Sequence, residues 1–262
     1  MSLQAKLDVF KVDFEAGKPP YSVPRSVIET MHRATAELVA SGAAQRVKKA
    51  GDVAPSFSLK DPEGNIISSD ALLKKGPLVV SFYRGVWCPY CNMELQALEV
   101  AKPAFDRYGA SLLAISPNSR KSMRQNNLTF PILSDVKGKV GAAFGLRFEL
   151  PDYLIELYKS LKNDLPTFSD DPSSTLPMPA RYVIGQDGTI LYSEVNPDYT
   201  HRLEPERHDP RVAAGCHRDG LKQPSRTNMK RDFDPIALLP EAADGAHQVK
   251  RPSAAVTQTD RR

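Results

Sequence analysis

Residues 78–94 read L-V-V-S-F-Y-R-G-V-W-C-P-Y-C-N-M-E, and positions 87–91 of this stretch hold the only Trp and two of the three Cys in the chain. The apolar, β-branched run that comes first is bounded by Gly76-Pro77 and predicts a buried central strand. Pro89 suits the first turn of a helix, where its missing N–H is not needed. A C-x-x-C pair between a strand and a helix is typical of thiol redox chemistry.

The two thiols can close a small disulfide ring if Cys88 stands at the N-terminus of the helix and Cys91 lies one turn further on. Unpaired amide N–H groups and the positive end of the helix dipole stabilise a thiolate at this place, which lowers the pKa of the first thiol. We therefore predict that Cys88 is the nucleophile and the more exposed of the two, and that Cys91 is the resolving thiol.

Two other uses of the cysteine pair stay open. A structural zinc site needs four N or S ligands, and the further candidates, Cys216 and His217, lie far along the chain. A buried, unreactive pair is the second alternative, and the strand–C-x-x-C–helix context argues against it. We expect no metal and no cofactor, and we interpret Cys216 as an incidental surface thiol.

Composition and charge exclude several classes of protein. The 262 residues carry 35 basic and 31 acidic side chains without a basic run, so nucleic acid is not an expected partner. No apolar stretch reaches the ~18 residues of a membrane helix, and residues 1–18 lack the apolar core of a signal peptide. Three cysteines are too few for a secreted disulfide framework. We therefore expect a cytoplasmic protein without a membrane partner.

Residues 1–46 are predicted to form an N-terminal helical extension. Over 24–41 apolar residues recur at helical intervals, with Pro24 suited to the first turn and Gly42 to the stop. The residues on this apolar face are Val27, Met31, Ala34, Leu38 and Val39. Another short helix is expected to come before them.

Short strand and helix signals alternate from residue 47 to residue 202. The expected strands are 57–59, 78–83, 112–115, 130–133, 181–184 and 189–192, and the expected helices follow Cys88 and Asp152 and cover 119–126 and 139–144. Gln186-Asp187-Gly188 is a strong hairpin signal between the last two strands. This order predicts an α/β fold with a central mixed β-sheet flanked by helices.

The alternation ends after residue 203. Phe233 is the only aromatic residue beyond Tyr199, and charges of both signs follow one another without a helical stripe. Such a segment lacks the apolar surface that would offset the entropy of ordering it. We therefore expect 203–262 to form a largely disordered tail, in which Pro235 to Leu239 is a candidate docking turn.

Several motifs resemble known families. W-C-P-Y-C resembles the thioredoxin active site in its Trp and the glutaredoxin active site in its C-P-Y-C. Further segments resemble, in order and spacing, the peroxiredoxins of the alkyl hydroperoxide reductase/thiol-specific antioxidant (AhpC/TSA) family. They are G-D-V-A-P-S-F-S-L at 51–59, D-P-E-G at 61–64, F-P-I-L-S-D at 130–135 and Y-V-I-G-Q-D-G-T-I at 182–190. The resemblance covers about residues 47–202 and implies a thioredoxin-like fold.

The chain departs from the peroxiredoxin pattern close to its thiols. The family shields its reactive thiolate and orients the peroxide with a Pro seven residues and a Thr three residues before the Cys. At those distances from Cys88 this chain has Ser81 and Gly85. A family Arg that polarises the peroxide would fall near Pro179.

Other residues are candidates for the missing roles. Arg84 and Arg181 could each supply positive charge near Cys88, and Arg202 is a weaker candidate. Met178-Pro179 resembles the thioredoxin-type cis-Pro, whose backbone binds an extended partner chain; X-Pro bonds tolerate the cis form, and the sequence leaves open whether this bond adopts it.

The resemblance implies a thiol peroxidase that reduces hydrogen peroxide or organic hydroperoxides. The Cys88 thiolate would become a sulfenic acid, Cys91 would condense with it to a disulfide, and thioredoxin, glutaredoxin or glutathione would reduce the pair. A thiol–disulfide oxidoreductase without efficient peroxidase activity, with Trp87 and Pro179 as its partner surface, is the second hypothesis. A non-catalytic interaction module is the third. A homodimer stays open.

Overall fold

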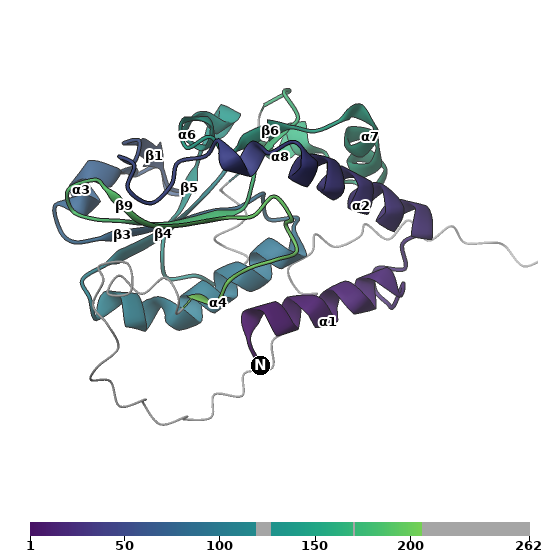
Figure 1. Ribbon diagram of the computed structural model, residues 1–262, viewed down its shortest axis with the longest axis horizontal. Helices are drawn as coiled ribbons and strands as arrows, with labels where there is room; N and C mark the ends of the chain where they lie inside the picture. The colour runs from purple at the N-terminus through teal and green to yellow at the C-terminus, as the bar shows by residue number, and fades with distance from the viewer. Residues whose placement is uncertain (119–126, 170, 206–262) are drawn as a thin grey trace, which may run out of the picture.

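The computed structural model describes residues 1–118, 127–169 and 171–205, and it shows helices packed on both faces of one large β-sheet (Figure 1). The predicted helix at 119–126 lies outside the described residues. The same holds for the tail beyond residue 205, which includes Cys216 and His217.

The large sheet has seven strands in the order β2-β1-β5-β4-β3-β8-β9. Its strands are β1 (Ser58–Lys60), β2 (Ile66–Ser68), β3 (Leu78–Phe82), β4 (Ser111–Ser116), β5 (Ile132–Ser134), β8 (Ala180–Ile184) and β9 (Ile190–Val195). β3, β4 and β5 run parallel, whereas β3 pairs antiparallel with β8 and β8 with β9. The sheet is therefore mixed, as the sequence predicts, and β3 lies among its inner strands.

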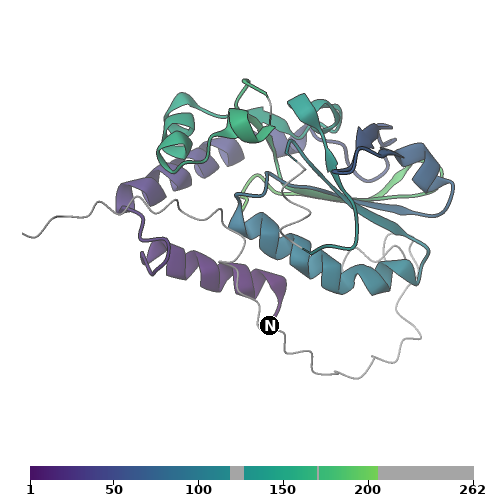
Figure 2. The same cartoon turned by 180° about the vertical axis from the view of Figure 1, so that it is seen from behind.

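Helices cover both faces of this sheet. They are α1 (Leu3–Glu15), α2 (Arg25–Ala40), α3 (Ser69–Leu73), α4 (Pro89–Asp106), α6 (Lys139–Ala143), α7 (Asp152–Ser160) and α8 (Leu165–Ser169), with short 3-10 turns at Ala43–Gln45 and Val136–Gly138. In both views α1 and α4 lie on one side of the sheet, and α2, α6, α7 and α8 lie on the other (Figures 1 and 2). Among the described helices, none is long and apolar enough to cross a membrane.

The alternation of side chains along β3 explains why the fold has two apolar layers. Val79 belongs to the cluster that contains the α4 residues Leu95 and Leu98, whereas Leu78 and Val80 belong to the cluster on the opposite face. Successive residues of a strand point to opposite faces, so a strand that is buried on both faces must be apolar throughout. All five residues of β3 are buried, which agrees with the uninterrupted apolar run in the sequence.

The N-terminal helices are part of this packing. Leu3 and Leu7 of α1 are buried in the α4 cluster, and the Phe10 ring meets the Tyr90 ring edge-on at 5.0 Å between centroids. α2 begins directly after Pro24, and Gly42 adopts a left-handed conformation just past its end, as predicted. The helical extension therefore covers the start of α4, where the two cysteines lie.

Most predicted strands are confirmed within two residues. The strands missed by the sequence prediction are β2 and the separate two-stranded sheet of β6 (Arg147–Glu149) and β7 (Thr175–Pro177). Each of them has only three residues, which leaves little room for an alternating pattern, although the equally short β1 and β5 were predicted.

We expect Leu7→Ala to lower the free energy of unfolding by about 2–5 kcal/mol, because Leu7 is fully buried against α4 and its loss would leave a cavity. Val12→Ala on the same helix is the control, since Val12 is 64% exposed and its loss should cost less than about 0.5 kcal/mol. Chemical denaturation of both variants measures the difference. Equal effects would mean that α1 is not docked in solution.

Candidate active site

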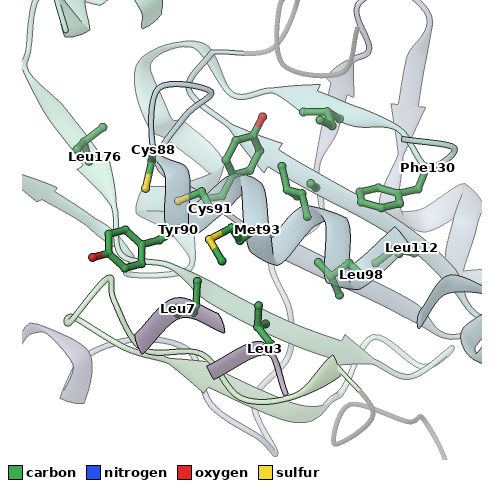
Figure 3. Close-up of a cluster of buried hydrophobic side chains, with 14 of the residues drawn as sticks. Leu3, Leu7, Cys88, Tyr90, Cys91, Met93, Leu98, Leu112, Phe130 and Leu176 are labelled. Atoms are coloured by element: carbon green, nitrogen blue, oxygen red, sulfur yellow. The ribbon is translucent and has the colours of Figure 1, made fainter. Parts of the chain in front are cut away.

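The two cysteines occupy the start of α4. Cys88 is the residue immediately before the helix, and Cys91 lies one turn inside it. Both are free thiols, and their side chains lie next to each other with Tyr90 beside Cys88 and Leu7 of α1 close by (Figure 3). Both thiols are buried, Cys88 at 1% and Cys91 at 0% exposed, so the predicted greater exposure of Cys88 is negligible. The N-terminal helices, which sequence alone could not place, close over this end of α4.

The environment treats the two thiols differently. Burial alone would raise the pKa of Cys88, but a hydrogen bond from the Cys91 thiol and the positive charge of Arg84 outweigh it and lower that pKa to about 6. Burial and the neighbouring Cys88 raise the pKa of Cys91 well above its ordinary value. Cys88 is thus the thiolate of the pair at neutral pH, and Cys91 is its hydrogen-bond donor.

Arg84 is a buried cation enclosed by aromatic rings. Its guanidinium carbon lies 4.2 Å from the ring centre of Tyr199 and 4.9 Å from that of Trp87, and it donates a hydrogen bond to the Tyr158 hydroxyl. Within the described parts of the chain it has no ion pair with a carboxylate, and its Nε has no hydrogen-bond partner. Aromatic faces compensate a buried charge only in part. The Cys88 thiolate therefore supplies the negative charge that Arg84 lacks.

A second network of buried charged side chains lies next to Cys91. Glu94 of α4, 2% exposed, pairs with Arg181 Nε at 3.2 Å and with Arg202 Nε. An Arg202 Nη2 atom lies 3.9 Å from Cys91 Sγ. Arg202 therefore reaches the dithiol, although the sequence made it the weaker candidate.

Arg181 is occupied elsewhere. Besides Glu94 it pairs with Glu194 on β9 at 3.4 Å. Arg84 and Arg202 are the cations whose charge lowers the pKa of Cys88 most. Glu94, Tyr158 and Tyr199 were not predicted as parts of the site. The spacing of the two tyrosines does not distinguish them from ordinary helix and loop residues. A carboxylate three residues after Cys91, on the same face of the helix, is the one signal that could have pointed to Glu94.

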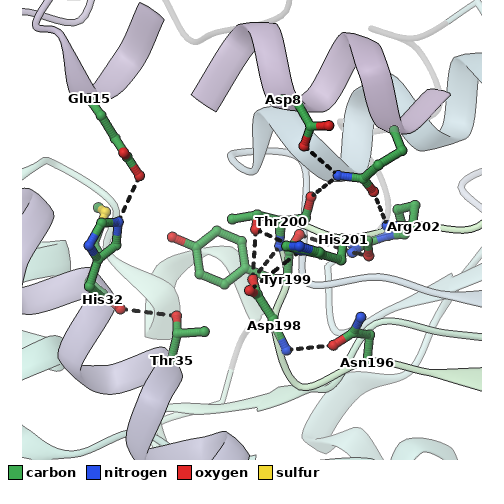
Figure 4. A network of polar contacts seen from close by, with 12 residues as sticks. Asp8, Glu15, His32, Thr35, Asn196, Asp198, Tyr199, Thr200, His201 and Arg202 are labelled. Atoms are coloured by element: carbon green, nitrogen blue, oxygen red, sulfur yellow. Dashed lines mark hydrogen bonds and ion pairs between the residues drawn. The ribbon is translucent and has the colours of Figure 1, made fainter. Parts of the chain in front are cut away.

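A short segment after β9 holds Arg202 in place. The Arg202 N–H donates to the Gln4 side chain of α1 at 2.7 Å, and its Nη1 donates to the carbonyl oxygens of Tyr199 and His201. Figure 4 shows Arg202 beside Tyr199, Thr200 and His201, with α1 above them. Arg202 is thus fixed by both ends of the described chain.

Trp87 and Pro179 do not form a partner surface in this structure. Trp87 is 7% exposed, and its ring packs against Tyr158 on one side and carries the Arg84 guanidinium over its face. Pro179 is buried as well. The Met178-Pro179 bond is trans, because the described residues contain a cis peptide bond only at Pro19-Pro20. The Met178 N–H continues the β6–β7 pairing by donating to Leu146 O at 2.9 Å, so the chain stays extended as it enters β8.

The two positions that depart from the peroxiredoxin pattern have structural explanations. Gly85 has φ +151°, and a Cβ there would lie 2.6 Å from Trp87 Nε1 and 2.8 Å from Asn118 Nδ2. A Thr cannot fit in this space. Ser81 is an interior residue of β3, paired with Ala114 on one side and Arg181 on the other. With no hydroxyl at position 85, Arg84 is the residue of the 81–85 stretch whose charge acts on Cys88.

Comparisons with known proteins agree on one family. The model of the AhpC/TSA family matches residues 50–193. The chain is 26% identical over 162 residues to peroxiredoxin Q, chloroplastic, of Oryza sativa subsp. japonica, with 60% of this chain and 62% of the relative covered. For peroxiredoxin Q of Gentiana triflora the identity is 27%, with the same coverage. The chain thus spans less than two thirds of the length of these relatives. Among solved structures, the peroxidoxin BcpB of Mycobacterium tuberculosis superposes with a TM-score of 0.49 at 23% identity, covering 64% of this chain and 96% of that one.

We expect the thiolate of Cys88 to appear as the pH rises through about 6, well below the ordinary thiol value of 9.0. In Arg84→Met this midpoint should move upward, because the cation that favours the charged form is gone. Arg107→Met is the control, since Arg107 is exposed just after α4. The ultraviolet absorbance of the thiolate, measured in a Cys91→Ser, Cys216→Ser background, follows the titration. An unchanged midpoint in Arg84→Met would contradict the assigned role.

We expect Gly85→Ala to destabilise the protein by about 1–3 kcal/mol more than Gly64→Ala. Both glycines have positive φ, at +151° and +93°, but only at Gly85 would the new methyl group collide with neighbouring side chains. Thermal and chemical denaturation of the two variants separate the clash from the backbone strain. Similar losses in both would show that the space around Gly85 is not restrictive.

Proposed function

The chain belongs to the AhpC/TSA family, and on that premise we propose that it is a thiol peroxidase, an oxidoreductase that reduces hydrogen peroxide or organic hydroperoxides. One observation carries the proposal. Cys88, with a pKa near 6, stands under the influence of a buried guanidinium that has no carboxylate partner among the described residues. A thiolate beside a fixed positive charge is what attack on an O–O bond requires.

In the first step the Cys88 thiolate attacks the terminal oxygen of the hydroperoxide. The S–O bond forms, the O–O bond breaks, and the electron pair leaves on the alkoxide or hydroxide, which takes up a proton to become an alcohol or water. Cys88 is oxidised to a sulfenic acid by two electrons. Arg84 supports this step, because its charge favours the thiolate and its unpaired Nε–H can donate to a peroxide oxygen.

In the second step Cys91 attacks the sulfenic sulfur of Cys88. The S–S bond forms, the S–O bond breaks, and hydroxide leaves with the proton of the Cys91 thiol as water. Burial, and after it the hydrogen bond and the charge of Cys88, hold the pKa of Cys91 high, whereas Arg202 and Arg84 lower it. Oxidation of Cys88 removes its charge and its hydrogen bond as an acceptor, while burial and the two guanidinium groups remain. The pKa of Cys91 therefore falls, and its thiol becomes more reactive, after Cys88 has been oxidised.

An external thiol completes the cycle. We propose thioredoxin, glutaredoxin or glutathione as the reductant, by exchange through a mixed disulfide, and a cytoplasmic location, where such thiols are kept reduced. Both sulfurs are buried beneath α1 and the segment around Tyr199, so a reductant reaches them only when this cover moves. We propose that residues 47–202 form the domain that carries out the redox reaction. The helical extension 1–46 contributes α1 to the cover, and the segment around Tyr199 contributes the rest.

We expect Cys88→Ser to lose peroxide consumption entirely, because the attacking sulfur is missing. Cys91→Ser should still consume one equivalent of hydrogen peroxide per chain and then stop at the sulfenic acid, which a dimedone adduct in mass spectrometry identifies. Cys216→Ser is the matched control and should turn over as the unaltered chain does. Consumption by Cys88→Ser, or a rate no higher than that of free cysteine, would contradict the peroxidase assignment.

The alternative activity has its own measurement. A general thiol–disulfide oxidoreductase would accelerate the reduction of insulin disulfides by dithiothreitol, and it would do so without rapid peroxide consumption. We expect no such acceleration, because Trp87 and Pro179 are buried and offer no groove for an extended partner chain.

A further inference from the structure

Two buried guanidinium groups reach the dithiol, and each acts mainly on a different sulfur. Arg202 is 5% exposed, and its Nη2 atom lies 3.9 Å from Cys91 Sγ. Burial raises the pKa of both thiols. Against it, Arg84 is the cation that lowers the pKa of Cys88 most, and Arg202 is the one that lowers the pKa of Cys91 most. The site therefore holds one arginine for each cysteine.

We propose that Arg202 is a catalytic residue of the second step, in which it stabilises the negative charge that develops on Cys91 as this sulfur attacks Cys88. The inference rests on the proposed peroxidase function and deepens it. It gives each step its own arginine, with Arg84 serving the attack on the peroxide and Arg202 the closure of the disulfide.

Hydrogen bonds fix the direction of all three nitrogens of the Arg202 guanidinium. Nε donates to Glu94, and Nη1 donates to the carbonyl oxygens of Tyr199 and His201. Among the residues that the structure describes, Cys91 Sγ is the contact that remains for Nη2. A guanidinium is planar and rigid, so fixing two of its nitrogens also fixes the third. Nη2 therefore stays aimed at Cys91, and Glu94 is a positioning residue.

The charge of Arg202 is balanced whether or not Cys91 is ionised. Glu94 also pairs with Arg181 at 3.2 Å, and Arg181 pairs with Glu194 at 3.4 Å, so two carboxylates face two guanidinium groups. Burial alone would lower the pKa of Arg202, but Glu94 and the two cysteines raise it above its ordinary value, and the group stays a cation. Such a network tolerates a neutral Cys91 in the reduced protein and keeps a donor beside it for the second step.

The chemistry of the second step places negative charge next to this donor. The S–S bond forms, the S–O bond of the sulfenic acid breaks, and the thiol proton of Cys91 leaves with hydroxide as water. While the proton departs, charge grows on Cys91 Sγ, which is fully buried. A donor that is already oriented in a site without water stabilises this charge and needs no reorganisation. Arg202 gives up no proton and is unchanged when the disulfide has closed.

The N-terminal extension holds the backbone of Arg202. The Arg202 N–H donates to the Gln4 side chain of α1 at 2.7 Å, and the N–H groups of Leu3 and Gln4 donate to Glu204. Both Gln4 and Arg202 lie outside residues 50–193, which the AhpC/TSA model matches. Gln4 is therefore a second positioning residue, and α1 contributes to the second step by keeping the segment after β9 in place.

A titration tests the contact without peroxide. The charged and titratable groups that act on Cys91 from the elements around it are Cys88, Arg84, Arg202 and Tyr158. In a full-length Cys88→Ser, Cys216→Ser chain, the ultraviolet absorbance of the Cys91 thiolate gives its midpoint. Arg202→Gln should raise this midpoint by about one pH unit, because the cation that favours the thiolate is gone. Arg107→Gln is the control and should leave it unchanged, since Arg107 is exposed just after α4.

Single-turnover kinetics with one equivalent of hydrogen peroxide assign the step. Arg202→Gln should form the sulfenic acid with little change in rate but close the disulfide roughly tenfold more slowly, so a dimedone adduct accumulates at Cys88. Arg84→Met removes the other buried guanidinium and is the matched comparison, which should slow the first step instead. Gln4→Ala removes the acceptor of the Arg202 N–H and should slow the second step by a smaller factor.

Two further variants of the outcome decide between a chemical and a structural role. Arg202→Lys keeps the cation without the planar fork, so it should restore the Cys91 midpoint but not the full rate of disulfide closure. Equal slowing of both steps in Arg202→Gln, or an unchanged Cys91 midpoint, would overturn the inference. If Arg202→Gln does not fold, Arg202→Lys and Gln4→Ala carry the test, and an unaltered second step in both would overturn it.

Failure of the peroxidase function would look different. The expected midpoints in a chain that consumes no peroxide would overturn the peroxidase and the catalytic step assigned to Arg202, while the electrostatic contact between Arg202 and Cys91 would stand. Rapid peroxide consumption with an unchanged midpoint in Arg202→Gln would overturn the role of Arg202 and leave the peroxidase intact.

Discussion

The burial of Arg84 without a carboxylate partner among the described residues is the constraint on which the site depends. A guanidinium removed from water needs compensation, and here it receives three aromatic faces, one tyrosine hydroxyl and the field of a thiolate. The same electrostatic interaction that favours the arginine cation lowers the pKa of Cys88. The attraction between Arg84 and Cys88 therefore both stabilises the buried arginine and activates the cysteine, because the charge of Arg84 is compensated only when Cys88 is a thiolate.

This arrangement also explains why the chain can belong to the AhpC/TSA family without the Pro and Thr that usually surround its reactive Cys. Trp87 lies beneath Arg84, and it can do so because Gly85 has no side chain in the space that Trp87 and Asn118 fill. In the peroxidase that we propose, Arg84, four residues before Cys88, would take the place of the hydroxyl that the family has three residues before its Cys. The exchange puts a full charge, rather than a neutral donor, next to the thiolate.

The sequence predicted the parts of the fold whose signals are local. The apolar run of β3, the hairpin at Gly188 and the C-x-x-C at the start of α4 each depend on a few neighbouring residues, and all three lie where they were expected. The burial of Cys88 and the approach of Arg202 to Cys91 depend on which distant segments pack together, and no local pattern encodes that. The roles of Cys88 and Cys91 as attacking and resolving thiols stay predictions.

The contacts that seal the site join opposite ends of the described chain. The Glu204 carboxylate accepts hydrogen bonds from the N–H groups of Leu3 and Gln4 at the start of α1, across 201 and 200 positions of sequence. During synthesis the N-terminus leaves the ribosome first, so α1 cannot form its hydrogen bonds to Glu204 until that residue has emerged. Contacts of such long range also form late in folding, because their loop closure costs the most entropy. The newly made protein therefore passes through a stage in which its two thiols are open to solvent and to any oxidant or reductant around it.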